Sequence, residues 1–199
     1  MMSSVATTES ARGIPARVSA RAIAPIQPGS TLVIGIGNPI LGDDGIGWRV
    51  VEEVERRWAG AVAVGLPAGR VPPPVAFRCA SLGGLSLMER LVGARRAILV
   101  DAVRTGDRPV GTVLVMPLED LVPDGSGHLD NAHDASLRVA LEAGRSLGAE
   151  LPVEIAVVGI VAHRVDEFGE ELSRPVAAAL PVAVEAVLDL LRTMATGSS

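Results

Sequence analysis

The chain has 199 residues, of which 48% are hydrophobic, so it can bury one substantial core and is short for two independent domains. Its formal charge of −5, from 23 acidic and 18 basic residues, gives no general electrostatic reason to bind nucleic acid or an anionic membrane. A single cysteine, Cys79, excludes an internal disulfide and fits a reducing compartment, so we expect a cytoplasmic protein in which Cys79 is a small buried hydrophobe.

Residues 1–30 contain Ser, Ala, Pro and several Arg but no apolar core of a secretory signal. They predict a disordered N-terminal extension ahead of a single α/β domain that spans residues 31–197. No apolar run in the chain approaches the roughly 20 residues that a membrane-spanning helix requires. We therefore expect no membrane partner.

Short apolar runs and amphipathic stretches alternate along the predicted domain. Residues 31–37 form a continuous apolar run that ends in Gly-Asn-Pro, which is typical of a buried parallel strand. Apolar residues then recur at helical spacing from Ile46 to Trp58, with charged residues between them. A final helix is predicted over residues 176–191, in which Pro181 marks a bend or a restart. The other predicted elements are strands at 75–79, 96–101, 111–118 and 153–160 and helices at 85–91 and 135–147.

This alternation predicts a three-layer α/β sandwich. In it, a mostly parallel, twisted sheet has helices on both faces and right-handed crossovers, as in phosphorylase/hydrolase-like folds. Ligands bind such sheets beyond the carboxyl ends of the strands, where the strand order changes. Residues that follow a strand therefore have the strongest claim to function, and three clusters meet that condition.

The first cluster is the segment 35–47, Gly-Ile-Gly-Asn-Pro-Ile-Leu-Gly-Asp-Asp-Gly-Ile-Gly, between the first strand and the first helix. A dinucleotide-binding loop would need glycine where Ile40 stands, and a phosphate-binding loop would need a Lys after the glycines. Asp43 and Asp44 are instead adjacent carboxylates at a helix start, where the helix dipole favours negative charge. We expect Asp43 to cap the helix, whereas capping and ligand roles are equally open for Asp44.

The second cluster is Asp101, which directly follows the apolar residues 97–100, and the third is the segment 125–134 before a helix. Asp101 alone would be a turn or cap residue, but its predicted position opposite the first loop favours a site. The third cluster leaves His128 and His133 both open. Two carboxylates and one imidazole would suit Zn, Ni, Co or Mn, and residue chemistry does not choose among these metals.

Three motifs in this order resemble those of the [NiFe]-hydrogenase maturation endopeptidases. They are Leu-Val-Ile-Gly-Ile-Gly-Asn-Pro with the later Asp-Asp-Gly-Ile-Gly, then Ile-Leu-Val-Asp-Ala-Val, then a His ahead of Ser-Leu and Ala-Leu. The resemblance covers the chain from Leu32 to the final helix. In it, Asp44 matches an acidic ligand that is often Glu, Asp101 matches a strand-end aspartate, and His133 matches the histidine at the next helix. Residues 79–84 differ from the glycine- and threonine-rich stretch of the family.

The resemblance implies an endopeptidase that removes the C-terminal extension of a [NiFe]-hydrogenase large-subunit precursor after nickel insertion. That precursor is the expected partner, and it carries the nickel. The resemblance assigns Asp44, Asp101 and His133 as the catalytic and metal-binding residues, which complete the coordination of the nickel. Other divalent metals can occupy the same site in the isolated protein. The attacking group, the proton donor and the oligomeric state are not predicted.

Two other functions fit part of the pattern. Peptidyl-tRNA hydrolases also have Gly-x-Gly-Asn-Pro after a buried strand, but a His-Asn pair follows where this chain has Asp43 and Asp44. The acidic balance of the chain also argues against a broad tRNA-binding face. A non-catalytic nucleotide or metabolite sensor would bind an anion at the glycine loop, which the paired carboxylates oppose. The sequence therefore favours the endopeptidase.

Overall fold

The structure is a computed structural model that describes residues 26–64, 74–120 and 132–196. Most of the predicted N-terminal extension lies outside these ranges, so its disorder stays a prediction. In the described ranges, no helix combines the length and the apolar character that crossing a bilayer requires. The elements in chain order are β1 (Thr31–Ile36), η1 (Gly42–Gly45), α1 (Ile46–Val64), β2 (Val75–Ala80), α2 (Gly84–Leu91), β3 (Arg96–Val103), β4 (Val113–Pro117), η2 (Leu118–Asp120), α3 (Ala132–Ser146), β5 (Glu154–Val161) and α4 (Arg174–Thr196).

The strands form one five-stranded sheet in the order β2-β1-β3-β5-β4. β2, β1, β3 and β5 are parallel to one another, and β4 is antiparallel to β5 at one edge. The chain between β3 and β4 contains no helix that would return it to the other end of the sheet. A parallel strand needs such a crossover, so β4 runs in the reverse direction. The predicted mostly parallel sheet is confirmed.

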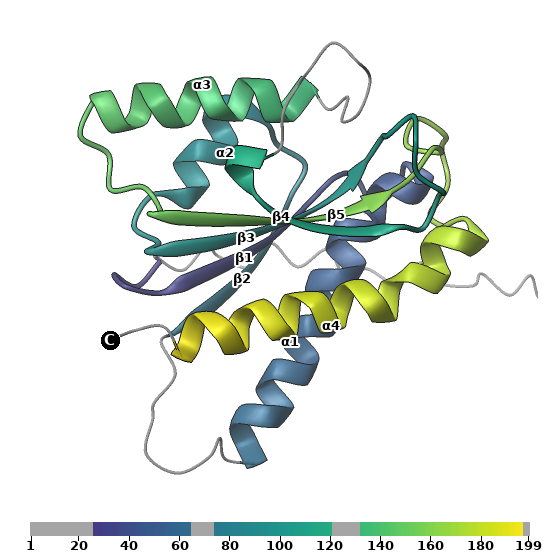
Figure 1. Cartoon of the computed structure of the whole chain (residues 1–199), viewed down its shortest axis with the longest axis horizontal. Coiled ribbons are helices and arrows are strands. Elements are labelled where there is room, and N and C mark those ends of the chain that lie inside the picture. Colours follow the sequence, from purple (N-terminus) through teal and green to yellow (C-terminus); the bar gives the residue numbers. More distant parts are fainter. Residues whose placement is uncertain (1–25, 65–73, 121–131, 197–199) are drawn as a thin grey trace, which may run out of the picture.

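Helices cover both faces of the sheet, as Figure 1 shows. α1 and α4 pack on one face and α2 and α3 pack on the other, and each pair shares a core of buried apolar side chains with the strands. Successive side chains of β3 point to opposite faces of the sheet, so the strand contributes to both cores. Ile98 and Val100 belong to the first core, and Ala97 and Leu99 belong to the second. The predicted three-layer sandwich is therefore confirmed.

The start of α1 lies very close to the sheet. A Cβ atom on Gly47 would lie 2.4 Å from the carbonyl oxygen of Ile36 and 2.5 Å from that of Val100. A Cβ atom on Gly35 would in turn lie 2.4 Å from the carbonyl oxygen of Gly47. Glycine has no Cβ, so these two positions allow the backbone of α1 to approach β1 and β3. This contact holds the loop before α1 against the carboxyl edge of the sheet.

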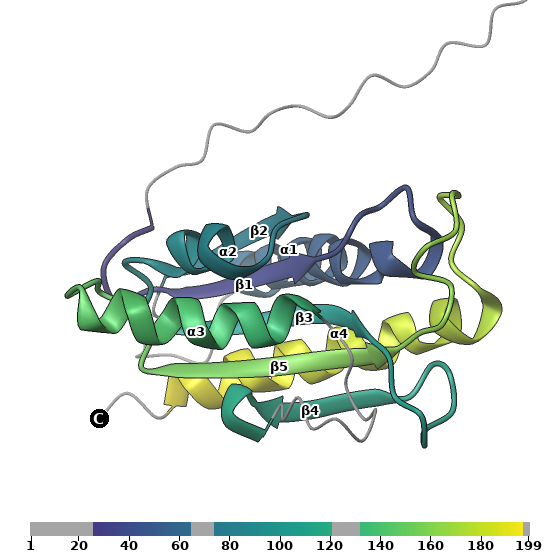
Figure 2. The ribbon, with the colours of Figure 1, turned by 90° about the horizontal axis from the view of Figure 1, so that it is seen from above.

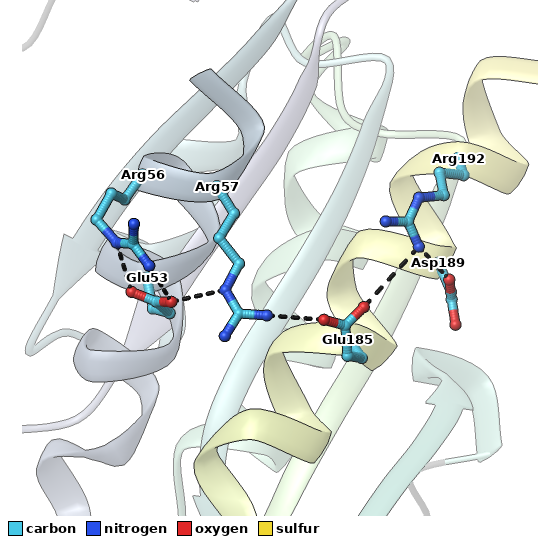
Figure 3. Close-up of polar contacts among 6 residues, drawn as sticks. All are labelled: Glu53, Arg56, Arg57, Glu185, Asp189 and Arg192. Atoms are coloured by element: carbon cyan, nitrogen blue, oxygen red, sulfur yellow. Dashed lines mark hydrogen bonds and ion pairs between the residues drawn. The ribbon is translucent and has the colours of Figure 1, made fainter. Parts of the chain in front are cut away.

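A chain of ion pairs links α1 to α4 on the surface of the protein (Figure 3). The guanidinium of Arg57 contacts Glu53 in α1 at 2.6 Å and Glu185 in α4 at 2.7 Å. Hydrogen bonds from Arg56 and Arg57 lower the pKa of Glu53 to about 2. Arg57 and Glu185 are both accessible to solvent, so their ion pair adds little to the stability of the fold.

α4 continues through Pro181 without interruption, so a restart of the helix at this residue is wrong. Proline removes one backbone hydrogen bond from a helix interior, but its ring is exposed here. Buried residues before and after it, including Val176 and Val184, pack in the same core. This burial compensates for the lost hydrogen bond and keeps the helix continuous.

Candidate functional site

Two loops meet at the carboxyl edge of the sheet. The first loop, residues 37–45, follows β1, and the second, residues 162–173, joins β5 to α4; Figure 2 shows them side by side. An isolated parallel bridge pairs Leu41 with Gly169. The backbone N–H of Gly42 donates to Gly169 at 2.6 Å, and the N–H of Gly169 donates to Ile40 at 3.0 Å. These bonds fix the shape of the first loop.

Asp43 anchors the first loop to the start of α4. One carboxylate oxygen accepts a 2.6 Å hydrogen bond from the backbone N–H of Ser173, and the other accepts a 2.9 Å bond from the Ser173 hydroxyl. The side chain is only 1% exposed. Asp43 was expected to cap the helix that follows it, but its carboxylate binds Ser173, the residue before α4. The donors come from the second loop, which lies against the first.

Asp44 lies in η1, the short helical turn that ends the first loop before α1, and its side chain is half-buried. Its Oδ2 atom accepts a 2.6 Å hydrogen bond from the backbone N–H of Asn38. Gly37 has a φ of +118°, and a Cβ atom on it would lie 2.0 Å from the Asp44 carbonyl oxygen. Only glycine fits there, so the loop folds back and holds the Asp44 carboxylate beside the end of β1.

Asp101 lies within β3, two residues before the end of the strand at Val103. The strand was predicted to end at Asp101, and it continues for two more residues. The strand continues because Ala102 and Val103 are apolar, are buried and pair with β5. The pairing of β3 with β1, however, stops at Val100. Asp101 is thus the first residue of β3 beyond its ladder with β1.

The Asp101 side chain belongs to the face of the sheet that α2 and α3 cover. Leu99, two residues earlier, packs in the core beneath those helices, and side chains two apart in a strand share a face. Asp101 is 5% exposed, and its partner on β5 is Gly159, which has no side chain. Since η1 contacts β3, the elements that carry Asp44 and Asp101 touch each other at this edge.

His133 belongs to the first turn of α3, but its side chain lies outside the described part of the chain, as does all of His128. The position of α3 is nevertheless defined. A Cβ atom on Gly84, the first residue of α2, would lie 3.1 Å from the hydroxyl of Ser136. α2 begins just after β2, so the first turns of α3 lie at the carboxyl edge and on the face to which Asp101 belongs.

Among the side chains that the structure describes, no three His, Cys, Asp or Glu groups gather closely enough to hold a metal ion. The imidazole of His133 is not among those side chains. The structure thus brings the elements of Asp44 and Asp101 together and sets α3 over the same edge. The complete trio of Asp44, Asp101 and His133 stays a prediction.

Two residues at the end of β2 could be considered as nucleophiles. Burial raises the pKa of the Cys79 thiol to about 12, with smaller contributions from Glu52 and Glu55, so the thiol is neutral at physiological pH. The hydroxyl of Ser81 donates a 2.7 Å hydrogen bond to the carbonyl oxygen of Gly37. A neutral thiol and a hydroxyl bound to a carbonyl are not activated for attack. Cys79 was expected to be a small buried hydrophobe, and it is partly buried and packs against the core shared by α1 and α4.

His163, which was not among the predicted site residues, is exposed and lies two positions after the end of β5. The next residue, Arg164, accepts a 2.9 Å hydrogen bond from the backbone N–H of Asp43 through its carbonyl oxygen. His163 therefore lies at the same edge as the first loop. The available signal was its position after a buried strand, which is the criterion that selected Asp101.

Comparison with known proteins shows to which family the chain belongs. The model of the family described as hydrogenase maturation protease matches residues 80–190, which is more than half of the chain. The chain belongs to the hydrogenase maturation protease family. The hydrogenase expression/formation protein HupD of Bradyrhizobium diazoefficiens is 31% identical over 151 residues, which cover 75% of this chain and 71% of the relative.

A relative and a solved structure from Escherichia coli extend the similarity. The hydrogenase 2 maturation protease is 28% identical over 162 residues, which cover 81% of this chain and 90% of the relative. The solved structure of the hydrogenase maturating endopeptidase HybD superimposes with a TM-score of 0.64 at 26% identity. That superposition covers 82% of this chain and 93% of HybD. The resemblance and the fold class from the sequence are both confirmed.

This hydrogenase maturation protease is a peptide hydrolase, so the interpretations as a peptidyl-tRNA hydrolase and as a non-catalytic sensor are set aside. The family match begins at Ala80 and therefore includes β3 with Asp101 and α3 with His133. The loop that carries Asp44 precedes the matched range. Its assignment rests on the motif at residues 35–47 and on the contacts described above.

Proposed function

We propose that this protease removes the C-terminal extension of a [NiFe]-hydrogenase large-subunit precursor after nickel insertion, in the cytoplasm. It recognises the nickel that the precursor carries, so the metal is part of the substrate. Asp44, Asp101 and His133 complete the coordination of this nickel. Carboxylate oxygens and an imidazole nitrogen form a mixed ligand set that suits Ni²⁺, although it also accepts other divalent metals in the absence of substrate.

The observation that carries the proposal is that two acidic residues share one edge of the sheet. Asp44 is bonded to Asn38 just beyond β1, and Asp101 is the first residue of the neighbouring strand beyond its ladder with β1. Parallel sheets bind ligands at this edge, where β1 lies between β2 and β3 and the order of strands reverses. Membership of the hydrogenase maturation protease family supports a hydrogenase protein as the substrate.

In this mechanism the nickel acts as a template that orients the precursor and as a Lewis acid that polarises the scissile carbonyl. The role of Asp44, Asp101 and His133 is to bind that metal at the carboxyl edge of the sheet. Cys79 and Ser81 are not activated, which suits an enzyme whose site is complete only when loaded substrate is bound. A precursor without nickel would not complete the site and would not be cut.

The direct test uses the purified protease with nickel-loaded and nickel-free precursor, and mass spectrometry of the released C-terminal peptide. We expect release from the loaded precursor alone. Equal cleavage of both forms would contradict nickel recognition while leaving the peptidase activity intact. Cleavage of neither form would contradict the proposed substrate.

The three ligands are tested by replacing each with Asn, which keeps a similar size but binds metal poorly. Asp44→Asn, Asp101→Asn and His133→Asn should each reduce processing on the order of 100-fold or more, because a metal template needs all its ligands. His128→Asn is the matched control and should process normally. If His128→Asn is inactive and His133→Asn is active, the imidazole assignment moves to His128. Normal processing by any of the three variants removes that residue from the site.

A further inference from the structure

Phe168 is 87% exposed, although it is one of only two phenylalanines in the chain. Phe168 and Ile40 directly precede the two residues of the parallel bridge, Gly169 and Leu41, so they occupy neighbouring positions on the two loops, and Ile40 is 48% exposed. An aromatic side chain gains free energy when it leaves water, so an exposed aromatic next to a second exposed apolar residue marks a contact surface. We name Ile40 and Phe168 the apolar pair.

The backbone on both sides of the apolar pair is held in place. Gly169 bonds the first loop through both its N–H and its carbonyl oxygen, and Arg49 of α1 donates a 3.0 Å bond to the carbonyl oxygen of Glu170. Phe168 is therefore presented to solvent by a loop that is fastened at its next two residues. A ligand that meets this surface would find it already formed, which lowers the entropy cost of binding.

Charged residues precede Phe168 in the second loop. Arg164 pairs with Glu167 at 2.8 Å, and Asp166 pairs with Arg104, which directly follows β3. An apolar centre with a polar rim is the usual anatomy of a protein contact, and aromatic residues are frequent at its centre. Leu147 and Val153, which are 88% and 80% exposed, lie near the opposite end of the sheet, where α3 ends and β5 begins.

The apolar pair is also joined to the residue proposed to bind nickel. The backbone N–H of Asp44 donates a 3.1 Å bond to the carbonyl oxygen of Leu41, which is the bridge partner of Gly169. Asp44 and Ile40 belong to the first loop, and Phe168 belongs to the second loop that is bridged to it, so a protein substrate bound at Asp44 lies at the loops that carry the apolar pair. A second copy of this chain at the same place would obstruct that substrate.

We infer that Phe168 and Ile40 bind an apolar side chain of the large-subunit precursor near the cleaved bond and determine which precursor the protease accepts. This inference rests on the proposed function. The contact does not touch the reacting atoms and is made equally before and during the reaction. It therefore lowers KM and leaves kcat unchanged.

The test replaces Phe168 by Ser and by Leu and measures the processing rate over a range of nickel-loaded precursor concentrations. Phe168→Ser should raise KM about tenfold, with kcat within about twofold of the wild type. Phe168→Leu, which keeps an apolar side chain, should restore most of the affinity. Ile40→Ser should raise KM by a smaller factor, because Ile40 exposes less of its side chain. Leu147→Ser is the matched control, since it makes the same apolar-to-polar change at the opposite end of the sheet, and its KM should not change.

Binding of the precursor to each variant, measured by biolayer interferometry, provides a result that does not depend on cleavage. Weaker binding by Phe168→Ser but not by Leu147→Ser, at an unchanged melting temperature, supports the inference.

A wild-type KM for Phe168→Ser, or a loss of kcat at unchanged KM, overturns the inference while the proposed function stands. If Phe168→Ser instead dissociates a dimer and processes normally, the surface serves a second copy and the inference is wrong. If the wild-type protease neither binds nor cleaves the precursor, the inference and the proposed function are both wrong.

Discussion

Asp43 and Asp44 are adjacent in sequence but have different surroundings. Both carboxylate oxygens of Asp43 accept hydrogen bonds from Ser173, and the side chain is almost completely buried. Asp44 remains half-buried and accepts a bond from Asn38 just beyond β1. Successive residues of a short helical turn project in different directions, which separates the two roles. One carboxylate holds the loop to α4, and the other lies at the carboxyl edge of the sheet.

This difference predicts that the two aspartates contribute unequally to stability. Asp43→Ala should lower the free energy of unfolding by about 2 to 3 kcal/mol, because two hydrogen bonds to a buried charge are lost. Asp44→Ala should lower it by about 1 kcal/mol, because the partly buried bond to Asn38 is lost. Urea unfolding of both variants measures the difference. Equal destabilisation would contradict the anchoring role of Asp43.

The titration of Cys79 should make the free energy of unfolding depend on pH in alkaline solution. The chain contains no Tyr, and all 18 of its basic residues are Arg, so Cys79 is the only side chain that titrates between about pH 9 and pH 12. Burial raises its pKa from 9.0 to about 12, so the unfolded chain loses this proton at a lower pH than the folded protein. The unfolded state then binds fewer protons above pH 9, and the free energy of unfolding falls as the pH rises from 9 towards 12.

Cys79→Ala isolates this effect. The variant should lose stability relative to the wild type at pH 8, since a partly buried side chain is shortened, but its stability should not decline further between pH 9 and pH 11. Urea midpoints at several pH values compare the two proteins under a reducing agent. A parallel alkaline decline in both proteins would mean that Cys79 is not its cause.

At the scale of the elements, the local hydrophobic pattern predicted individual strands and helices but not the contacts between them. The apolar run at residues 31–37 predicted β1, because burial on both faces leaves a continuous apolar signal. The antiparallel direction of β4 was not predicted, since it depends on the path of the chain and not on any residue of the strand. The bonds between Asp43 and Ser173 join residues 130 positions apart, and no periodicity reports such a contact. The imidazole of the site was left open between His128 and His133 for the same reason.

α1 offers two glycines with opposite predicted effects. Gly47→Ala would place a Cβ atom 2.4 Å from the carbonyl oxygen of Ile36, and a backbone atom cannot move away without displacing β1. We expect a loss of about 3 kcal/mol or more, or failure to fold. At Gly60, nothing lies within 4 Å of the new Cβ atom, so Gly60→Ala should stabilise the protein by about 0.5 to 1 kcal/mol through helix propensity.

Thermal unfolding of the two alanine variants checks this contrast within one helix. Gly60→Ala controls for the intrinsic preference of a helix for alanine, so the difference between the variants reports the packing of α1 on the sheet. A small effect of Gly47→Ala would show that α1 can shift away from β1. The first loop, and Asp44 with it, would then be less constrained than the contacts indicate.

At the scale of the whole molecule, the site depends on the middle of the sheet. β1 and β3 are adjacent central strands, and Asp101 belongs to β3 while the first loop leaves from β1. α3 covers one face of the sheet, and the second loop leads into α4, which covers the other face. Residues that are distant in the sequence therefore lie together at the carboxyl ends of two adjacent strands. The position of the site should be as stable as the fold itself.

Native-state hydrogen exchange measures that stability strand by strand. We expect the hydrogen-bonded amides of β1, β3 and β5 to exchange only by global unfolding, because each of these strands is buried and lies between two others. The bonded amides of β4 should open with a free energy lower by about 2 kcal/mol or more, since β4 is an edge strand with exposed residues. Mass spectrometry of exchanged and digested protein resolves the strands. Exchange in β3 as fast as in β4 would contradict a rigid support for Asp101, and the site would then have to form when substrate binds.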